Sequence, residues 1–277
     1  MRREVLNIEG VATPVVSAGP DADTEAVVCL HGNPGSSDDW VDLAPRVAPF
    51  ARIVAPDMPG FGAAAKPDDF DYSVPGYTRH LAKLLSNLNV RRAHFVLHDF
   101  GGAWGLSWAL AHPEAVASLT LVNIGVLPGY QWHVMARIWR TPGLGELSMA
   151  TATASTFRWG LKPGNPRGLP RAFVDGMYAH FDAGTRRAVL RLYRATDDIG
   201  ALFAGRAEEI HTLKAPVCVV WGAADPYVSI RYAREQLTFF PAAELSVFDD
   251  SGHWPHADNP ERFADVVVPF LRRARGG

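Results

Sequence analysis

Features that would place this chain outside the cell or in a membrane are scarce. Its 277 residues include only two cysteines, Cys29 and Cys218, and both lie inside apolar runs. This predicts buried free thiols in a reducing compartment rather than a disulfide framework. No run reaches the roughly 20 apolar residues of a membrane span, and residues 1–7 lack the apolar stretch of a signal peptide. We therefore expect a cytoplasmic protein with no membrane partner.

An excess of charge of one sign is also lacking. The formal net charge is −2, with 27 basic and 29 acidic residues, so the composition gives no reason to expect nucleic acid as a partner. The chain has no internal repeat and no low-complexity segment. With 48% hydrophobic and 20% charged residues, it has the composition of a globular protein that can bury a large core.

Near-continuous apolar runs recur along the chain and end in loop residues. Such runs are typical of parallel strands buried on both faces. Helical patterns lie between several of them, notably at residues 77–89 and 102–112. This alternation predicts an α/β fold with a doubly wound, mostly parallel sheet. The expected strands are 26–30, 52–55, 94–97, 119–122, 217–221 and 244–248.

The alternation of strands and helices is interrupted in the second half of the chain. The interrupting segment has mixed helical patterning, several prolines and glycines, and three tryptophans. It lies between two expected strands. We interpret residues 126–213 as a helical lid inserted into a core domain made of residues 1–125 and 214–277.

The segment Phe95–Gly102 combines a strand, a sharp turn and the start of a helix. An apolar run ends near a single carboxylate, Asp99, which is followed at once by a phenylalanine, a glycine pair and a helical pattern. A strand that turns on one residue into a helix raises that side chain over the sheet edge, which is the geometry of a nucleophile elbow. The residue at the tip is usually Ser. A carboxylate there attacks carbon by displacement and leaves an alkyl ester on the enzyme, which narrows the chemistry.

Two other roles for Asp99 fit the local sequence. A loop Asp is a good helix N-cap, and without further markers capping is the more common role. Asp99–Gly101 also spells the metal-binding triplet of protein kinases, but the HRD string and glycine-rich loop that accompany it are missing. Residues later in the chain favour the nucleophile.

His253 and Asp225 follow later strands and complete an acid–base set. A neutral imidazole can take a proton from water, which then attacks the ester carbonyl of Asp99. Asp225 would accept the second N–H of His253 and orient its ring. A turn aspartate is the alternative role for Asp225, and Asp249 and Asp250 are its rivals because they lie close to His253 in sequence.

These markers resemble the α/β-hydrolase superfamily over nearly the whole chain, in its Asp-nucleophile branch of epoxide hydrolases and haloalkane dehalogenases. His31–Pro34 resembles the family's HGxP oxyanion-hole loop, and Asp57–Gly62 resembles its next loop. Nucleophile, acid and histidine follow in the order expected of this fold. The resemblance implies that the backbone N–H groups of Asn33 and Phe100 stabilise the developing oxygen charge during ester hydrolysis.

A few positions distinguish the two groups of the branch. His98–Gly102 is similar to the His-Asp-Trp-Gly-Gly of epoxide hydrolases. Two residues before the nucleophile, however, epoxide hydrolases usually have Gly, and Leu97 at this position is more similar to dehalogenases. In haloalkane dehalogenases Asn33 would help to hold the departing halide, but their second donor, a Trp after the nucleophile, is Phe100 here and has no N–H. Haloacetate dehalogenases carry Arg at that place. Some dehalogenases take the orienting acid from the position of Asn123, which cannot carry the charge.

The lid supplies a further cue. Arg191–Ala195 resembles the Tyr-Arg string late in the epoxide hydrolase lid, which implies that Tyr193 donates a proton to the epoxide oxygen. Haloacetate dehalogenases also use a tyrosine near this place, and a core tyrosine on an amphipathic helix is the alternative role. Epoxide hydrolases have a second lid tyrosine, for which Tyr130 is the nearest candidate. Trp132 and Trp139 either pack the lid or line an apolar pocket.

We therefore predict a hydrolase that opens epoxides to vicinal diols through an ester on Asp99. Its partners would be a small apolar organic substrate and water, and it would be a monomer or homodimer. The alternative is a haloalkane or haloacid dehalogenase with the same residues. A ligand receptor without turnover fits less well, because the set of nucleophile, acid and base is complete. An ordinary esterase fits less well, because attack of a carboxylate on an ester gives an anhydride. We expect no cofactor and no metal, since His256 would form a metal site with His253 only with further ligands.

Overall fold

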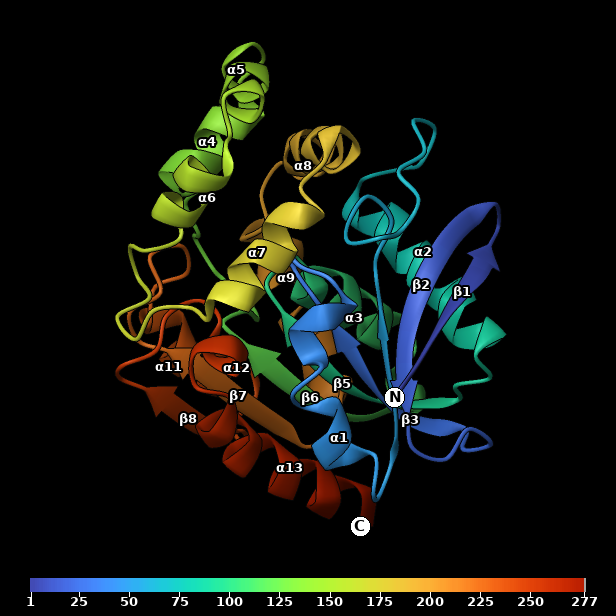
Figure 1. Ribbon diagram of the computed structural model, residues 1–277. Helices are drawn as coiled ribbons and strands as arrows, with labels where there is room; N and C mark the ends of the chain where they lie inside the picture. The colour runs from blue at the N-terminus through green and yellow to red at the C-terminus, as the bar shows by residue number, and fades with distance from the viewer. Residues whose placement is uncertain (277) are drawn as a thin grey trace.

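The protein folds around an eight-stranded sheet (Figure 1). The structure is a computed structural model and describes residues 1–276. The strands are β1 (Arg2–Ile8), β2 (Val11–Ala18), β3 (Glu25–Leu30), β4 (Arg52–Pro56), β5 (Arg92–His98), β6 (Val116–Val122), β7 (Val217–Gly222) and β8 (Glu244–Phe248). Their order is β1-β2-β4-β3-β5-β6-β7-β8. β2 runs antiparallel to β1 and β4, and the strands from β4 to β8 pair in parallel.

The α/β class and the mostly parallel sheet are confirmed, and each expected strand lies within one of β3 to β8. The sequence did not predict β1 and β2. β1 is largely exposed at the sheet edge and has no continuous apolar run, and the apolar run of β2 is interrupted by Thr13 and Pro14. The two expected helices are α2 (Val74–Asn87) and α3 (Phe100–Ala111), each of which begins earlier than predicted. In α2 the early start has a clear cause, since the Ser73 hydroxyl caps the helix by accepting the Gly76 N–H.

Successive side chains of the buried strands point into two different cores. In β5, Phe95 and Leu97 pack in the larger core, and Val96 between them packs in the other. Helices α2, α3 and α11 (Arg231–Phe239) cover the first face, whereas α1 (Ala44–Val47) and α13 (Pro260–Gly276) cover the second. Cys29 and Cys218 both lie in the second core as buried free thiols. Both faces of the central strands β3 to β7 are thus largely closed to water.

Between β6 and β7 the chain forms a group of helices, and several of them, among them α5 (Leu144–Ala150) and α8 (Ala183–Ala195), lie above the sheet in Figure 1. α4 (Val134–Arg140) packs against α5 and α8, and α6 (Ala154–Gly160) packs against α7 (Arg171–Ala179). The group also includes α9 (Ala201–Ala204) and α10 (Ala207–Thr212). The boundaries of the lid, 126–213, stay a prediction.

Three short helices complete the chain: η1 (Ser37–Trp40), η2 (Pro113–Ala115) and α12 (Pro255–Asp258). η1 follows the loop after β3, and α12 follows the loop after β8. In residues 1–276, no helix has both the length and the apolar character that crossing a membrane requires.

Candidate active site

Asp99 is the single residue between the end of β5 and the start of α3. Its backbone has φ 50° and ψ −126°, a left-handed conformation that is costly for a residue with a side chain. The Asp99 side chain makes no capping hydrogen bond to α3. Its Oδ1 instead accepts the backbone N–H of Asn33 at 2.7 Å. The alternative role as a helix cap is therefore wrong, because the sharp turn directs the carboxylate away from the helix amides.

Glycines allow the turn at Asp99 to pack against β3 and the loop after it. A Cβ on Gly101 would lie 2.5 Å from the carbonyl oxygen of Leu30, and a Cβ on Gly32 would lie 2.2 Å from the Asp99 Cβ. Both distances are shorter than any tolerated contact. The two glycines thus bring the carboxylate within hydrogen-bond reach of the Asn33 amide.

His253 lies between two carboxylates. Its Nδ1 is 2.7 Å from Asp225 Oδ2, and its Nε2 is 3.6 Å from Asp99 Oδ2. Asp225 also accepts the backbone N–H groups of Tyr227 and Val228 on Oδ1, at 2.7 and 3.0 Å. Asp225 therefore shapes the turn and holds the imidazole at the same time, so the two roles considered for it coexist.

Asn123 supports the same carboxylate. Its Nδ2 donates to Asp225 Oδ2 at 2.6 Å and its Oδ1 accepts the Gly222 N–H at 3.0 Å. The two sequence rivals lie elsewhere: Asp249 is exposed, and Asp250 forms an ion pair with Arg167 at 2.6 Å. Chain order thus selected the acid that the structure brings to His253.

The charges of this group fix its protonation. Burial raises the pKa of Asp99, but the hydrogen bond and charge of His253 outweigh burial and lower the pKa to about 2. Burial lowers the pKa of His253, but Asp225 and Asp99 outweigh burial and raise it to about 10. Both shifts favour the charged forms in the free protein, so they favour a protonated His253 and an ionised Asp99, as a nucleophile must be.

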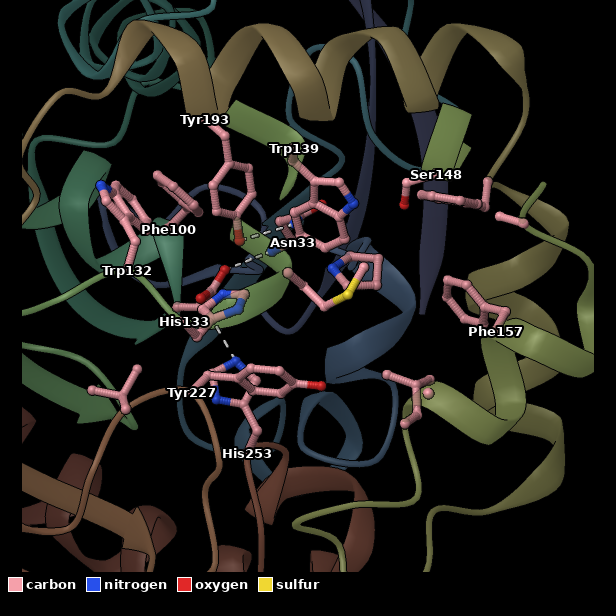
Figure 2. A pocket seen from close by; sticks show the side chains of 18 of the residues that line it. Asn33, Phe100, Trp132, His133, Trp139, Ser148, Phe157, Tyr193, Tyr227 and His253 are labelled. Carbon is pink, nitrogen blue, oxygen red and sulfur yellow. Dashed lines mark hydrogen bonds and ion pairs between the residues drawn. The ribbon is translucent and has the colours of Figure 1, made fainter. Parts of the chain in front are cut away.

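A cavity of about 410 Å³ lies between this group and the lid helices (Figure 2). Asp99, Asn33 and His253 form part of its floor, and the rest of the wall is mainly apolar and aromatic. The cavity has the size and lining of a site for a small organic ligand. Lid residues that line it include Trp132, Trp139, Met149, Phe157, Leu161 and Phe181.

Phe100 and Tyr193 meet in the wall of the cavity, with ring centroids 5.1 Å apart. Asn33 Nδ2 donates to the Tyr193 hydroxyl oxygen at 3.3 Å. Because that oxygen accepts, the phenolic proton remains available to a molecule in the cavity. Burial raises the pKa of Tyr193 well above its ordinary value, so the hydroxyl stays protonated. Tyr193 is thus both a buried lid residue and a hydrogen-bond donor at the cavity.

The other predicted lid residues line the cavity, but two of them have their polar groups engaged elsewhere. The Tyr130 hydroxyl donates to the carbonyl oxygen of Tyr227 at 3.2 Å. Trp132 Nε1 donates to the carbonyl oxygen of Asp197 at 3.2 Å. Trp139 packs on Tyr193, with ring centroids 5.0 Å apart. These residues shape the pocket, and the hydroxyl of the suggested second proton donor, Tyr130, donates its hydrogen bond to a backbone carbonyl instead.

The sequence interpretation missed His133, which lines the same cavity at the N-terminus of α4 (Figure 2). Its Nδ1 accepts the Ala136 N–H at 3.2 Å, so the proton of the neutral ring belongs on Nε2. Burial lowers the pKa of His133 to about 4, which keeps the ring neutral. His133 is therefore a neutral N–H donor. Its signal in the sequence is weak, because histidine is not among the residues that commonly cap helices.

Comparison with known proteins agrees with this architecture. The family model described as alpha/beta hydrolase fold matches residues 25–260. A cis-3-alkyl-4-alkyloxetan-2-one decarboxylase of Xanthomonas campestris pv. campestris is 29% identical in an alignment of 288 positions, which covers 95% of this chain and 93% of that protein.

Two solved structures extend the comparison. The crystal structure of an ancestral haloalkane dehalogenase superposes with a TM-score of 0.85 at 26% identity, over 99% of this chain and 100% of the other. An epoxide hydrolase from Vigna radiata superposes with a TM-score of 0.80 at 19% identity, over 98% of each chain, and shows the shared fold alone.

Proposed function

Because this chain belongs to the α/β-hydrolase family, we propose that it opens epoxides to vicinal diols through an ester on Asp99. The observation that carries the proposal is the Tyr193 hydroxyl, whose oxygen accepts from Asn33 and whose proton is free for the cavity that Asp99 lines. An epoxide needs such a donor because its leaving alkoxide is a poor leaving group. The substrate would be a small apolar molecule that fits the aromatic cavity.

In the first step, an Asp99 carboxylate oxygen attacks an epoxide carbon, and that carbon's bond to the ring oxygen breaks. The oxygen takes the Tyr193 proton, which leaves a hydroxyalkyl ester and a phenolate. The ester removes one of the two negative charges that raise the pKa of His253, so its pKa falls. His253 then releases its proton, which restores Tyr193, and becomes a neutral base.

In the second step, His253 takes a proton from water and the hydroxide attacks the Asp99 carbonyl carbon. The oxyanion that forms is held by the Asn33 amide, which already contacts Asp99 Oδ1, together with the amide of Phe100 at the start of α3. The intermediate collapses and expels the diol alkoxide, which takes the proton of the new Asp99 carboxyl group. Asp99 is again a carboxylate and His253 again an imidazolium, so the proton balance closes.

His133 is the second donor in this proposal, in place of Tyr130. Its neutral Nε2–H would hydrogen-bond to the developing alkoxide without giving up its proton. Its ring packs on Tyr227 at 4.9 Å and faces Tyr193 at 6.3 Å between ring centroids, which supports a fixed orientation at the cavity. Two donors on one oxygen distribute the negative charge that forms as the ring opens.

Carbon–halogen hydrolysis is the second candidate. Two observations favour it: the side-chain amide of Asn33 lies at the cavity floor, and the fold is similar to that of a haloalkane dehalogenase over 99% of this chain. Against it, Phe100 carries no N–H and the Trp132 N–H is bound to a backbone carbonyl. A departing halide would therefore lack the indole donor. The β-lactone in the name of the Xanthomonas relative is also a strained C–O ring, so it belongs in the substrate test.

The test is intact-protein mass spectrometry of His253→Gln incubated with 1,2-epoxyoctane, 1-bromooctane and a cis-3,4-dialkyl β-lactone. Without its base the protein should form the ester and fail to release it. We expect an adduct with the whole mass of the epoxide, mapped to the peptide that contains Asp99. The matched control is His211→Gln, which removes an exposed histidine and should leave turnover intact.

Other outcomes reassign the substrate or reject the chemistry. An adduct of the octyl group without bromine, and none from the epoxide, would make the protein a dehalogenase. An adduct from the lactone alone would mean that the substrate is a four-membered lactone ring and not an epoxide. Folded protein with no adduct from any of the three would contradict the nucleophilic role of Asp99 toward these classes.

A further inference from the structure

Behind the catalytic residues lies a second buried group of a carboxylate and two histidines. We call Asp39, His98 and His256 the rear cluster. Each offers one potential ligand atom, and these three atoms all lie within 4.8 Å of one another. Asp39 lies in η1 after the Asn33 loop, His98 ends β5, and His256 lies in α12. The rear cluster thus joins the three loops that carry the oxyanion hole, the nucleophile and the base.

Each member of the rear cluster leaves a polar atom free. Asp39 Oδ1 accepts the Ser36 N–H at 3.3 Å, but its Oδ2 has no partner within residues 1–276. His98 Nε2 contacts the carbonyl oxygen of His253 at 2.8 Å, so this nitrogen carries the proton and Nδ1 carries an unpartnered lone pair. Both ring nitrogens of His256 lack partners in the described part of the chain.

Unpartnered polar atoms lower the stability of the folded state when they are buried, and all three residues are buried. The exposed fractions are 7% for Asp39, 1% for His98 and 4% for His256. Leaving one buried polar group unsatisfied costs about 1–3 kcal/mol, and a charged group costs more. No basic side chain among the described residues forms an ion pair with Asp39. The rear cluster therefore contains a carboxyl group that has no ion-pair partner and two imidazole rings that can each offer a lone pair to a metal.

We propose that the rear cluster is a divalent transition-metal site, with zinc as the ion that best suits two imidazoles and a carboxylate. Zinc binds these groups at about 2.0–2.2 Å in a tetrahedron, which places ligand atoms roughly 3.4 Å apart. The three atoms, which lie within 4.8 Å of one another, thus need to approach by up to about 1.4 Å. A ligating histidine usually donates its other N–H to a backbone carbonyl, as His98 does to His253, and a ligating carboxylate is itself hydrogen-bonded, as Asp39 is to Ser36.

The metal would stabilise the fold, and because the rear cluster supplies three ligands, a water molecule would complete the tetrahedron. His256 stacks on Trp40 with ring centroids 4.8 Å apart, and that indole shields it from solvent. A metal here would hold η1, the end of β5 and α12 together, directly behind the carbonyl of His253. Its binding energy would appear as stability of the folded state, because the unfolded chain has no such site. The proposal does not depend on which substrate the protein hydrolyses.

The experiment measures metal binding in tag-free protein. After dialysis against a weak chelator, the metal content of wild type is determined by inductively coupled plasma mass spectrometry, and stripped protein is titrated with Zn²⁺ and Co²⁺. We expect one equivalent of zinc, the visible absorption of tetrahedral cobalt, and a higher Tm with metal. His256→Gln should lower affinity at least about 100-fold, since even outer-shell changes cost about 10- to 100-fold.

Two further variants keep the test decisive. Asp39→Asn conserves shape and should also lose the metal, whereas His211→Gln, at an exposed site, should bind as wild type does. Circular dichroism verifies that each variant is folded. Wild type that takes up neither metal, or folded His256→Gln and Asp39→Asn variants that bind it with unchanged affinity, would overturn the proposal.

Discussion

The proposed catalytic residues, Asp99, Asp225 and His253, and the rear cluster are both built from aspartate and histidine, yet their polar atoms are partnered very differently. Asp225 accepts four hydrogen bonds, and His253 lies between two carboxylates. The rear cluster has four unpartnered side-chain atoms among the described residues. His98 connects the two groups through the His253 carbonyl. Asp99, Asp225 and His253 are thus held by contacts with one another and with neighbouring groups of the protein. The rear cluster instead has lone pairs that no group in residues 1–276 contacts.

The two groups also show what controls the charge of a buried histidine. Burial lowers the pKa of both His253 and His256. Asp225 and Asp99 reverse the effect at His253, whereas the neighbouring rings of His98 and His253 add to it at His256. The His256 pKa is therefore far below its ordinary value. Burial alone yields a neutral ligand, and a contacting carboxylate yields a charged acid or base.

The largest expected effect on activity distinguishes the carboxylate of Asp99 from that of Asp39. Asp99→Ala should lower kcat/KM at least about 10,000-fold, because no other group can form the ester. Asp39→Asn should stay within about tenfold of wild type, since Asp39 touches no reacting atom. Steady-state kinetics on the epoxide measures both. Equal losses in the two variants would contradict the division into a catalytic and a structural group.

The two histidines should differ in which step they affect. His253→Gln should slow turnover about 1,000-fold while the first ester still forms, because attack by Asp99 does not need the base. His256→Gln should retain turnover within about tenfold. Rapid-quench measurement of ester and diol separates the steps. Loss of ester formation in His253→Gln would show that the imidazolium is needed for the first step as well.

The two proposed donors should matter only for oxygen leaving groups. Tyr193→Phe should lower epoxide turnover about 100-fold, the lower range of general-acid catalysis, and His133→Gln should lower it about tenfold. Neither change should slow hydrolysis of a bromoalkane in the same way, since bromide leaves without a proton. Parallel kinetics on both substrates provides the control. A similar loss with the bromoalkane would indicate a packing defect in the lid.

A smaller effect concerns the pKa of His253. Its pKa is raised to about 10 by Asp225 and Asp99, so removing one charge with Asp99→Ala should lower it by at least about one unit, or 1.4 kcal/mol. The imidazole then loses its proton at lower pH in the variant than in wild type. An NMR titration of the ring nitrogens in the variant and in wild type measures the change. An unchanged pKa would mean that Asp225 alone sets the charge.

The sequence was informative where one short segment carries both the residue and its geometry. The elbow at Asp99 could be recognised because strand, turn and helix are contiguous, and Asp225 and His253 each follow a strand in the expected order. His133 and the rear cluster could not be found this way. Asp39, His98 and His256 meet only because the sheet brings three distant loops to one end. The hydrogen bond that occupies Tyr130 likewise depends on how the lid folds onto Tyr227.

The central claim is that Asp99 forms a covalent ester, and a single turnover in H₂¹⁸O tests it most directly. With enzyme in excess over 1,2-epoxyoctane, water attacks the Asp99 carbonyl carbon, so the first diol should carry no ¹⁸O. The label should appear in the peptide that contains Asp99. A first-turnover diol that carries ¹⁸O, with an unlabelled Asp99, would mean that water attacks the substrate directly and would contradict the account.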